Sequence, residues 1–95
     1  MIKTDFQYRV RYRTESFQTN KVLLADNFSC VCFLNKGEVN AYINGNVLIR
    51  PTESFSFNEN PDTTIETDFD VSFDSDADEN KIRSVCAICS YYEQN

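Results

Sequence analysis

Phe6-Gln7-Tyr8-Arg9-Val10-Arg11-Tyr12-Arg13 alternates apolar and polar side chains at every step. A period of two is typical of a β-strand with one buried and one solvated face, because successive side chains point to opposite faces of a sheet. The stretch therefore predicts a strand whose Phe6, Tyr8, Val10 and Tyr12 side chains face the core. No segment repeats apolar residues at the helical spacing over a helical length, so the sequence predicts an all-β fold.

Seven further stretches predict strands, at residues 21–24, 28–34, 39–43, 46–49, 54–58, 63–73 and 81–92. Asn44-Gly45 separates two of them, and this dipeptide favours the positive φ angles of a type I′ hairpin turn. Further turns are expected at residues 35–37 and 51–52, with a longer loop at residues 58–62. About eight short antiparallel strands punctuated in this way predict a β-sandwich or barrel.

The composition favours one soluble domain over residues 1–95, since a chain of 95 residues is too short for two cores. Nine basic and 15 acidic residues give a net charge of −6, which opposes binding to nucleic acids and anionic membranes. The apolar runs are far shorter than a membrane span, and no secretion signal is visible at the N-terminus. We therefore expect a cytoplasmic protein, or one in the host cytoplasm or virion if a phage encodes it.

Residues 32–57 resemble the centre of the cupins, which are small jelly-roll barrels. Gly37 matches the glycine that closes the first cupin motif, and residues 51–54 (Pro-Thr-Glu-Ser) look like the turn that opens the second motif. The pattern of turns and strands carries the resemblance over roughly residues 20–92. It implies a single jelly-roll domain.

The chain contains no histidine, although most cupins bind a metal through histidines and a glutamate. The resemblance places Cys30 at the position of that glutamate and Thr63 at that of the last histidine. The two other histidine positions fall on Leu24 and Asp26, or one residue earlier on Leu23 and Ala25. These residue types do not form a cupin metal site, so we expect no metal and no cofactor.

A metal-free cupin-like barrel is expected to work by binding a partner, without catalysis. Its ligand pocket would be lined by inward-facing residues of the central strands, and the same side chains suit a plain core: Phe28, Cys30, Cys32, Tyr42, Phe55 and Phe57. One alternative is a phage accessory or structural protein that assembles through its surface. Another is an enzyme similar to the small cupin-fold nucleoside phosphorylases, which require no metal.

Two other groups of residues have a chemical interpretation. Four thiolates can close a structural zinc site, but residues three apart in a strand face opposite ways, which separates Cys86 from Cys89. We therefore favour free thiols in a reducing compartment. Residues 74–78 space three aspartates as a calcium loop does, yet Glu79 stands where such a loop needs glycine. An acidic, solvated loop is the ordinary interpretation.

Three arginines, Arg9, Arg11 and Arg13, occupy one face of the first predicted strand. Residues 1–24 carry a net charge of +3 and residues 25–95 a net charge of −9, counted from the same sequence. This asymmetry suggests an interface with a protein partner or with a second copy of the chain. The alternatives are pairing within the molecule and a solvated edge strand, whose charges discourage unwanted sheet pairing. A stripe that binds phosphate or nucleic acid is a further alternative, which the acidic remainder of the chain disfavours.

Overall fold

The computed structural model describes residues 8–58 and 64–94, in which it contains eight β-strands. They are β1 (Tyr8–Phe17), β2 (Lys21–Leu23), β3 (Cys30–Asn35), β4 (Ala41–Ile43), β5 (Val47–Ile49), β6 (Ser54–Asn58), β7 (Phe69–Phe73) and β8 (Val85–Gln94). In this part of the chain there is no helix long and apolar enough to cross a membrane. The predicted all-β class is confirmed.

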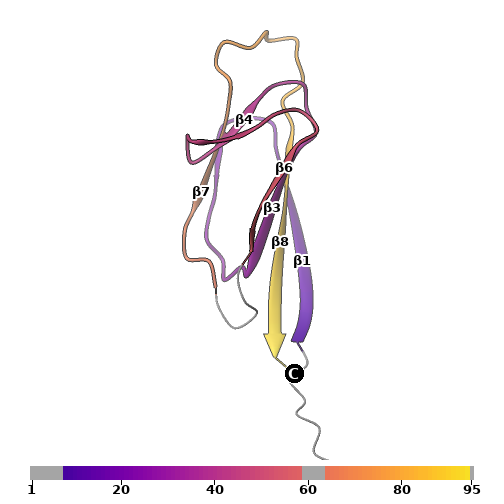
Figure 1. Cartoon of the computed structure of the whole chain (residues 1–95), viewed down its shortest axis with the longest axis vertical. Helices are drawn as coiled ribbons and strands as arrows, with labels where there is room; N and C mark the ends of the chain where they lie inside the picture. Colours follow the sequence, from indigo (N-terminus) through magenta and orange to yellow (C-terminus); the bar gives the residue numbers. More distant parts are fainter. Residues whose placement is uncertain (1–7, 59–63, 95) are drawn as a thin grey trace, which may run out of the picture.

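The strands form two antiparallel four-stranded sheets, with strand orders β1-β8-β3-β6 and β2-β7-β4-β5. The pairing is nested: β4 pairs with β5, β3 with β6, β2 with β7, and β1 with β8. Figure 1 shows β7 and β4 on one side of the molecule and β3, β6, β8 and β1 on the other. The eight described strands do not close into a barrel.

The two longest strands, β1 and β8, run side by side beyond the rest of their sheet (Figure 1). Their pairing extends without interruption from Tyr8 opposite Gln94 to Phe17 opposite Val85. The pairing of β8 with β3 ends where Ser90 lies opposite Cys30. Residues 8–11 and 91–94 therefore form a two-stranded ribbon at one end of the molecule.

The predicted facing of β1 is wrong at the residue where the structure tests it, because the Tyr12 side chain is 69% exposed. Phe17 is buried in the core. Arg13 and Glu15 lie four and two positions before it, so all three are on the same face of β1, and Tyr12 is on the other face. A shift of one residue moves every side chain of a strand to the other face. Phe6 lies outside the described residues.

Apolar side chains fill the space between the two sheets. Phe28, Val31 and Phe33 are fully buried, and Phe33, Phe57 and Phe69 form a group of aromatic rings with centroids 4.8–6.1 Å apart. The buried cluster consists of Phe17, Leu23, Phe28, Val31, Phe33, Val39, Ala41, Ile43, Ile49, Phe69, Val71, Phe73, Val85, Ala87 and Cys89. Every strand except β6 contributes to it.

The hairpin turn predicted at Asn44-Gly45 is confirmed. Asn44 has a φ of 54° and Gly45 a φ of 75°, and two positive φ angles are what a type I′ turn requires. The amide of Asn46 donates to the carbonyl of Ile43 over 3.3 Å and closes the turn between β4 and β5.

The turn that follows β3 depends on two residues, Asn35 and Gly37. A Cβ atom on Gly37 would lie 2.6 Å from the carbonyl oxygen of Ile82, so only glycine allows this close approach of two backbones. Asn35 is buried, and its Nδ2 donates to the carbonyls of Val39 (2.8 Å) and Ile49 (2.9 Å), while its Oδ1 accepts from the Gly37 amide (2.9 Å).

Several predicted strands begin later than the sequence suggests, and those at 39–43 and 81–92 begin at Ala41 and Val85. The prediction for residues 28–34 holds from Cys30 onward, and Phe28 instead forms an isolated bridge with Ile65. The strand predicted at residues 63–73 is regular only from Phe69, and residue 63 lies outside the described part of the chain.

Candidate functional site

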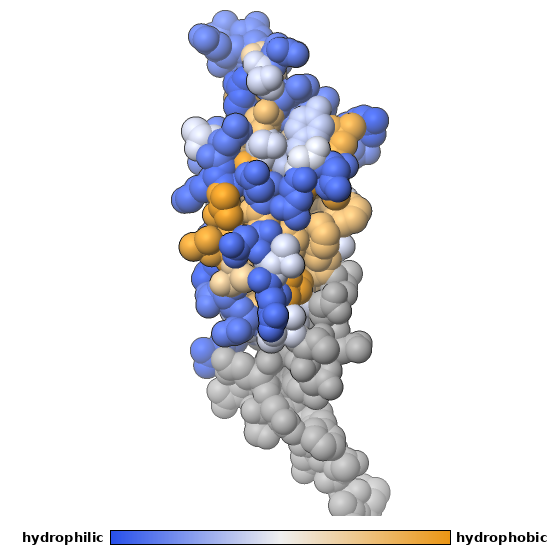
Figure 2. All heavy atoms as spheres, turned by 90° about the vertical axis from the view of Figure 1, so that its left-hand side faces the viewer, coloured by the Kyte–Doolittle hydropathy of each residue, from blue (hydrophilic) through white to orange (hydrophobic). Residues whose placement is uncertain are grey.

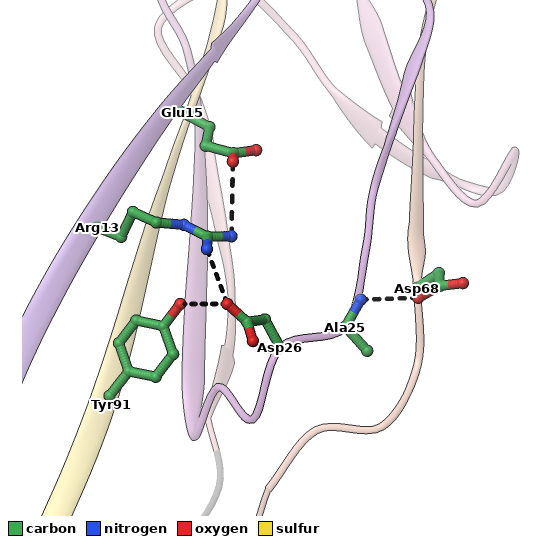
Figure 3. Close-up of polar contacts among 6 residues, drawn as sticks. All are labelled: Arg13, Glu15, Ala25, Asp26, Asp68 and Tyr91. Carbon is green, nitrogen blue, oxygen red and sulfur yellow. Dashed lines mark hydrogen bonds and ion pairs between the residues drawn. The ribbon is translucent and has the colours of Figure 1, made fainter.

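The most organised group of charged side chains is centred on Arg13, at the edge of the sandwich (Figure 3). The Nη1 of Arg13 donates to Oδ2 of Asp26 over 2.8 Å, and the Tyr91 hydroxyl donates to the same oxygen over 3.1 Å. Nη2 of Arg13 lies 3.5 Å from a carboxylate oxygen of Glu15. The cluster thus connects β1, the segment after β2, and β8.

Aromatic rings support the guanidinium of Arg13 from the core side. Its Cζ lies 5.1 Å from the centroid of the Phe28 ring, a distance at which cation–π attraction acts. Phe28 in turn meets Tyr91 edge to face, with centroids 5.2 Å apart. Arg13 Nε is buried and has no hydrogen-bond partner among the described residues.

A short loop places Asp26 in this cluster. The amide of Ala25 donates to Oδ1 of Asp68 over 2.7 Å, which ties the loop to the segment before β7 (Figure 3). Asn27 has a φ of 59°, a conformation that asparagine tolerates better than most residues, and it turns the chain toward Phe28.

The cluster pairs one cation, Arg13, with two carboxylates, those of Glu15 and Asp26. Burial lowers the pKa of Arg13, but Tyr91, Glu15 and Asp26 outweigh burial and raise it. Burial raises the pKa of the Tyr91 hydroxyl, and its hydrogen bond to Asp26 raises it further. Arg13 is therefore a fixed cation and Tyr91 a neutral donor near pH 7, and neither is prepared for proton transfer.

A surface groove of about 420 Å³ lies beside this cluster, and we call it the Arg13 groove. It is lined by Arg13, Glu15, Lys21, Val22, Leu24, Ala25 and Asp26. Two of its apolar side chains are well exposed, Val22 by 45% and Leu24 by 65%. Exposed apolar groups bordered by paired charges are typical of protein interfaces.

The side of the molecule where β7 lies is shown in Figure 2. Hydrophilic side chains cover most of its upper part, and apolar side chains gather around its middle. A small hollow of about 200 Å³ is lined by Asn44, Phe57, Ile65, Thr67 and Phe69. It is an opening between packed core side chains and contains no ionisable group.

The six residues predicted to line a ligand pocket do not surround one cavity. Phe28 is part of the core, and Phe55 and Phe57 pack against each other with centroids 4.9 Å apart. Cys30 and Cys32 alternate with buried Val31 and thus occupy the outer face of their sheet, and Tyr42 lies between two buried neighbours on the outer face of the other sheet.

The predicted separation of the cysteines agrees with the structure. Cys89 is fully buried, whereas Cys86 lies on the opposite face of β8, on the same side as Cys30 and Cys32. Burial raises the pKa of Cys89 to about 11, and burial followed by repulsion from Cys32 raises that of Cys30. These two thiols are protonated near pH 7, which makes them poor nucleophiles.

No three metal-binding side chains lie together within residues 8–58 and 64–94. Leu24 and Asp26 border the Arg13 groove, while Cys30 faces away from the core. The three residues that the resemblance placed at metal positions therefore do not converge. Thr63 lies outside the described residues. Asp74, Asp76 and Asp78 border an open hollow of about 460 Å³ together with Glu38 and Lys81.

The three arginines predicted to form an interface have different surroundings. Arg13 is paired within the molecule, the Arg11 side chain is exposed, and the side chain of Arg9 lies outside the description. The sequence did not reveal Asp26 and Tyr91 as partners of Arg13. Asp26 is 13 positions from Arg13 and 65 from Tyr91. The pairing of β1 with β8 brings Tyr91 near Arg13, and the loop after β2 brings Asp26 to both.

Comparison of this chain with protein-family models, with curated proteins and with solved structures finds no match.

Proposed function

We propose that this chain is a metal-free, cupin-like jelly-roll module that works by binding a protein partner at its surface, without catalysis. The nested strand pairing supports the jelly-roll part, because a jelly roll arranges eight antiparallel strands as a double sheet of this kind. The resemblance to cupins around Gly37 and residues 51–54 is compatible with the same topology.

One observation carries the functional part: side chains fill the space between the sheets. Phe28, Val31, Phe33 and Val71 are fully buried there, where a small-molecule barrel has its ligand cavity. A ligand therefore has to bind on the exterior. The Arg13 groove is the exterior feature that combines exposed apolar side chains with ordered charges.

The groove runs beside β1, which is an edge strand of its sheet. An extended segment of a partner can pair with an edge strand through main-chain hydrogen bonds, and its alternate side chains then enter a neighbouring groove. We propose this mode of binding, with Val22 and Leu24 as the apolar contacts.

Selection of binders from a library of ten-residue peptides tests this proposal. Bound peptides are expected to slow hydrogen exchange at the amides of β1. Leu24→Glu should weaken their binding about tenfold, the equivalent of about 1.4 kcal/mol. Ile82→Glu is the matched control, because Ile82 is 61% exposed and does not line the groove, and it should leave binding unchanged.

A thermal-shift series with sugars, nucleosides, inorganic phosphate and small carboxylic acids tests the alternative, in which the chain binds a small molecule or acts as an enzyme. A ligand that binds only the folded state raises the Tm in a saturable way. Such a rise with any of these compounds, or phosphate-dependent release of base from a nucleoside, would contradict a non-catalytic protein-binding module. We expect neither result.

A further inference from the structure

The four edge strands of the two sheets differ in length. β6 contains five residues, β2 and β5 three each, and β1 ten. Short edge strands protect a sheet from pairing with other chains, as do prolines and bulges. β1 has neither proline nor glycine, and its register with β8 is continuous. By its length and continuity β1 is therefore the edge best suited to accept another strand, and its charged side chains discourage pairing with strands of unmatched charge.

The charges along β1 limit which strand it accepts. Arg11 and Arg13 are basic and Glu15 is acidic, and all three have the same parity in the strand. In an antiparallel pair, side chains directly opposite each other are close, so opposite charges attract and like charges destabilise. A suitable partner strand has an acidic residue opposite an arginine and a basic residue opposite Glu15.

β1 itself meets this requirement. We propose that the partner strand is β1 of a second copy of this chain, which joins the two sheets into one antiparallel sheet of eight strands. This inference rests on the proposed function, because it names the partner that occupies the edge beside the Arg13 groove.

Two-fold symmetry restricts the register of this contact. The axis that relates two antiparallel neighbours stands perpendicular to the sheet and keeps each side chain on its own face. Residues directly opposite each other must lie on the same face. Each allowed register therefore has one central residue of β1 directly opposite the same residue of the second copy, and the register is named by that residue. Centring on Arg11, Arg13 or Glu15 pairs like charges directly, and centring on Tyr12 places Arg11 opposite Arg13 of the second copy.

Centring on Thr14 avoids these repulsions. It places Arg13 of each copy opposite Glu15 of the other and pairs residues 11–17 of both strands. The two Thr14 side chains then face each other, a pair that stabilises antiparallel sheets. Within one chain Arg13 lies 3.5 Å from Glu15 and 2.8 Å from Asp26. Because its contact with Arg13 is the longer one, Glu15 is the carboxylate that can more easily pair with Arg13 of the second copy.

Cysteine cross-linking measures this register. Tyr12, Thr14 and Ser16 are exposed on one face of β1, and a disulfide requires Cα atoms within about 7 Å of each other. After mild oxidation with oxidised glutathione, Thr14→Cys should form a covalent dimer. Tyr12→Cys and Ser16→Cys should remain at the level of the wild type, which controls for the four native cysteines.

Sedimentation equilibrium of the full chain provides the second measurement. The wild type should show a concentration-dependent monomer–dimer equilibrium. Glu15→Arg should raise the dimer dissociation constant about tenfold or more, because it places two arginines opposite each other. Glu79→Arg changes the net charge equally in a loop far along the chain from β1, and it should leave the constant unchanged.

Three results would overturn the proposal: a strict monomer at millimolar concentration, cross-linking centred on Tyr12 or Ser16, or equal cross-linking of all three variants. The proposed function fails separately, if no selected peptide protects the β1 amides. A monomer that still binds such peptides would retain the edge-binding function and exclude the second copy as its partner.

Discussion

Thr52 holds a backbone conformation that β-branched residues rarely adopt, with a φ of 73°. It follows Pro51 in a turn closed by the Glu53 amide, which donates to the Arg50 carbonyl over 2.9 Å. Proline followed by a residue with positive φ is the pattern of a type II turn, in which glycine is preferred at the second of these positions.

Thr52→Gly should therefore raise the free energy of unfolding by about 1 kcal/mol, after allowance for the greater entropy of glycine in the unfolded chain. Urea denaturation measures this change. Thr14→Gly in the regular strand β1 should lower the free energy instead, since glycine weakens a strand interior. Destabilisation by both substitutions would contradict the presence of strain at Thr52.

Asn35 is a buried polar residue whose side chain uses one acceptor bond and two donor bonds. Asn35→Ala leaves the carbonyls of Val39 and Ile49 and the amide of Gly37 without these partners. Each unsatisfied buried group costs roughly 1 kcal/mol or more, so we expect a loss of about 2–4 kcal/mol. Asn40→Ala, at a half-buried position in the same region, is the control for urea denaturation and should cost clearly less.

At the level of the elements, β8 carries the buried thiol of Cys89 between Arg13 of β1 and Val31 of β3. Burial raises the pKa of this thiol from 9.0 to about 11. Between these pH values the thiol ionises in the unfolded chain but stays protonated in the fold. The stability that it contributes is thus complete below pH 9 and is lost as the pH rises to 11.

The free energy of unfolding should accordingly fall by about 2 kcal/mol across this range, when it is measured by urea denaturation at a series of pH values. Tyr91 adds to this fall in the free energy of unfolding at the upper end of the pH range, because the pKa of its hydroxyl is raised as well. Cys89→Ala should lower the free energy of unfolding at every pH because packing is lost. Between pH 9 and 11, however, this free energy should fall less steeply than in the wild type. An unchanged slope in this variant would assign the alkaline loss to other groups.

The ribbon formed by β1 and β8 should be the least stable part of the larger sheet. Residues 8–11 and 91–94 pair with each other and with no third strand in the described part of the chain, whereas residues 85–90 also pair with β3. Two-stranded ribbons are marginal in water. Amide exchange should thus be faster at residues 8–11 and 91–94 than at residues 85–90. Equal rates would mean that the two strands open as one unit.

These elements show what short-range patterns predict. The Asn44-Gly45 turn, the strand that ends at Asn58 and the separation of Cys86 from Cys89 follow from two-residue periodicity and turn chemistry. The same periodicity does not determine which face of β1 is buried. Phe17 decides that, and it lies beyond the stretch in which the alternation is clearest.

At the level of the whole molecule, the candidate site depends on contacts that no local pattern encodes. The sequence identifies Arg13 as part of a charged strand, but it singles out Asp26 only as the position of a cupin histidine and not as a partner of Arg13. Tyr91 joins them because β8 returns beside β1 from the far end of the chain. The six residues predicted to line a ligand pocket do not converge either, because Cys30 and Cys32 lie on the outer face of β3.

The nested topology also predicts an order of folding. β4 and β5 are joined by the short Asn44-Gly45 turn, whereas β1 and β8 come together across almost the whole chain. Loop closure costs less entropy for near neighbours, so the central hairpin should form first and the outer pairs afterwards. Gly45→Ala costs about 1 kcal/mol at its positive φ, and this loss should appear mainly as slower folding.

Phe17→Leu provides the comparison, because Phe17 is buried at the end of β1 and its partner Val85 begins β8. The substitution Phe17→Leu should lower the free energy of unfolding by about 1 kcal/mol. This loss should appear mainly as faster unfolding, since β1 and β8 are expected to pair after the transition state. Stopped-flow folding and unfolding in urea separates the two effects. If instead Phe17→Leu slows folding and Gly45→Ala speeds unfolding, then β1 and β8 meet early, and folding does not proceed outward from the central hairpin.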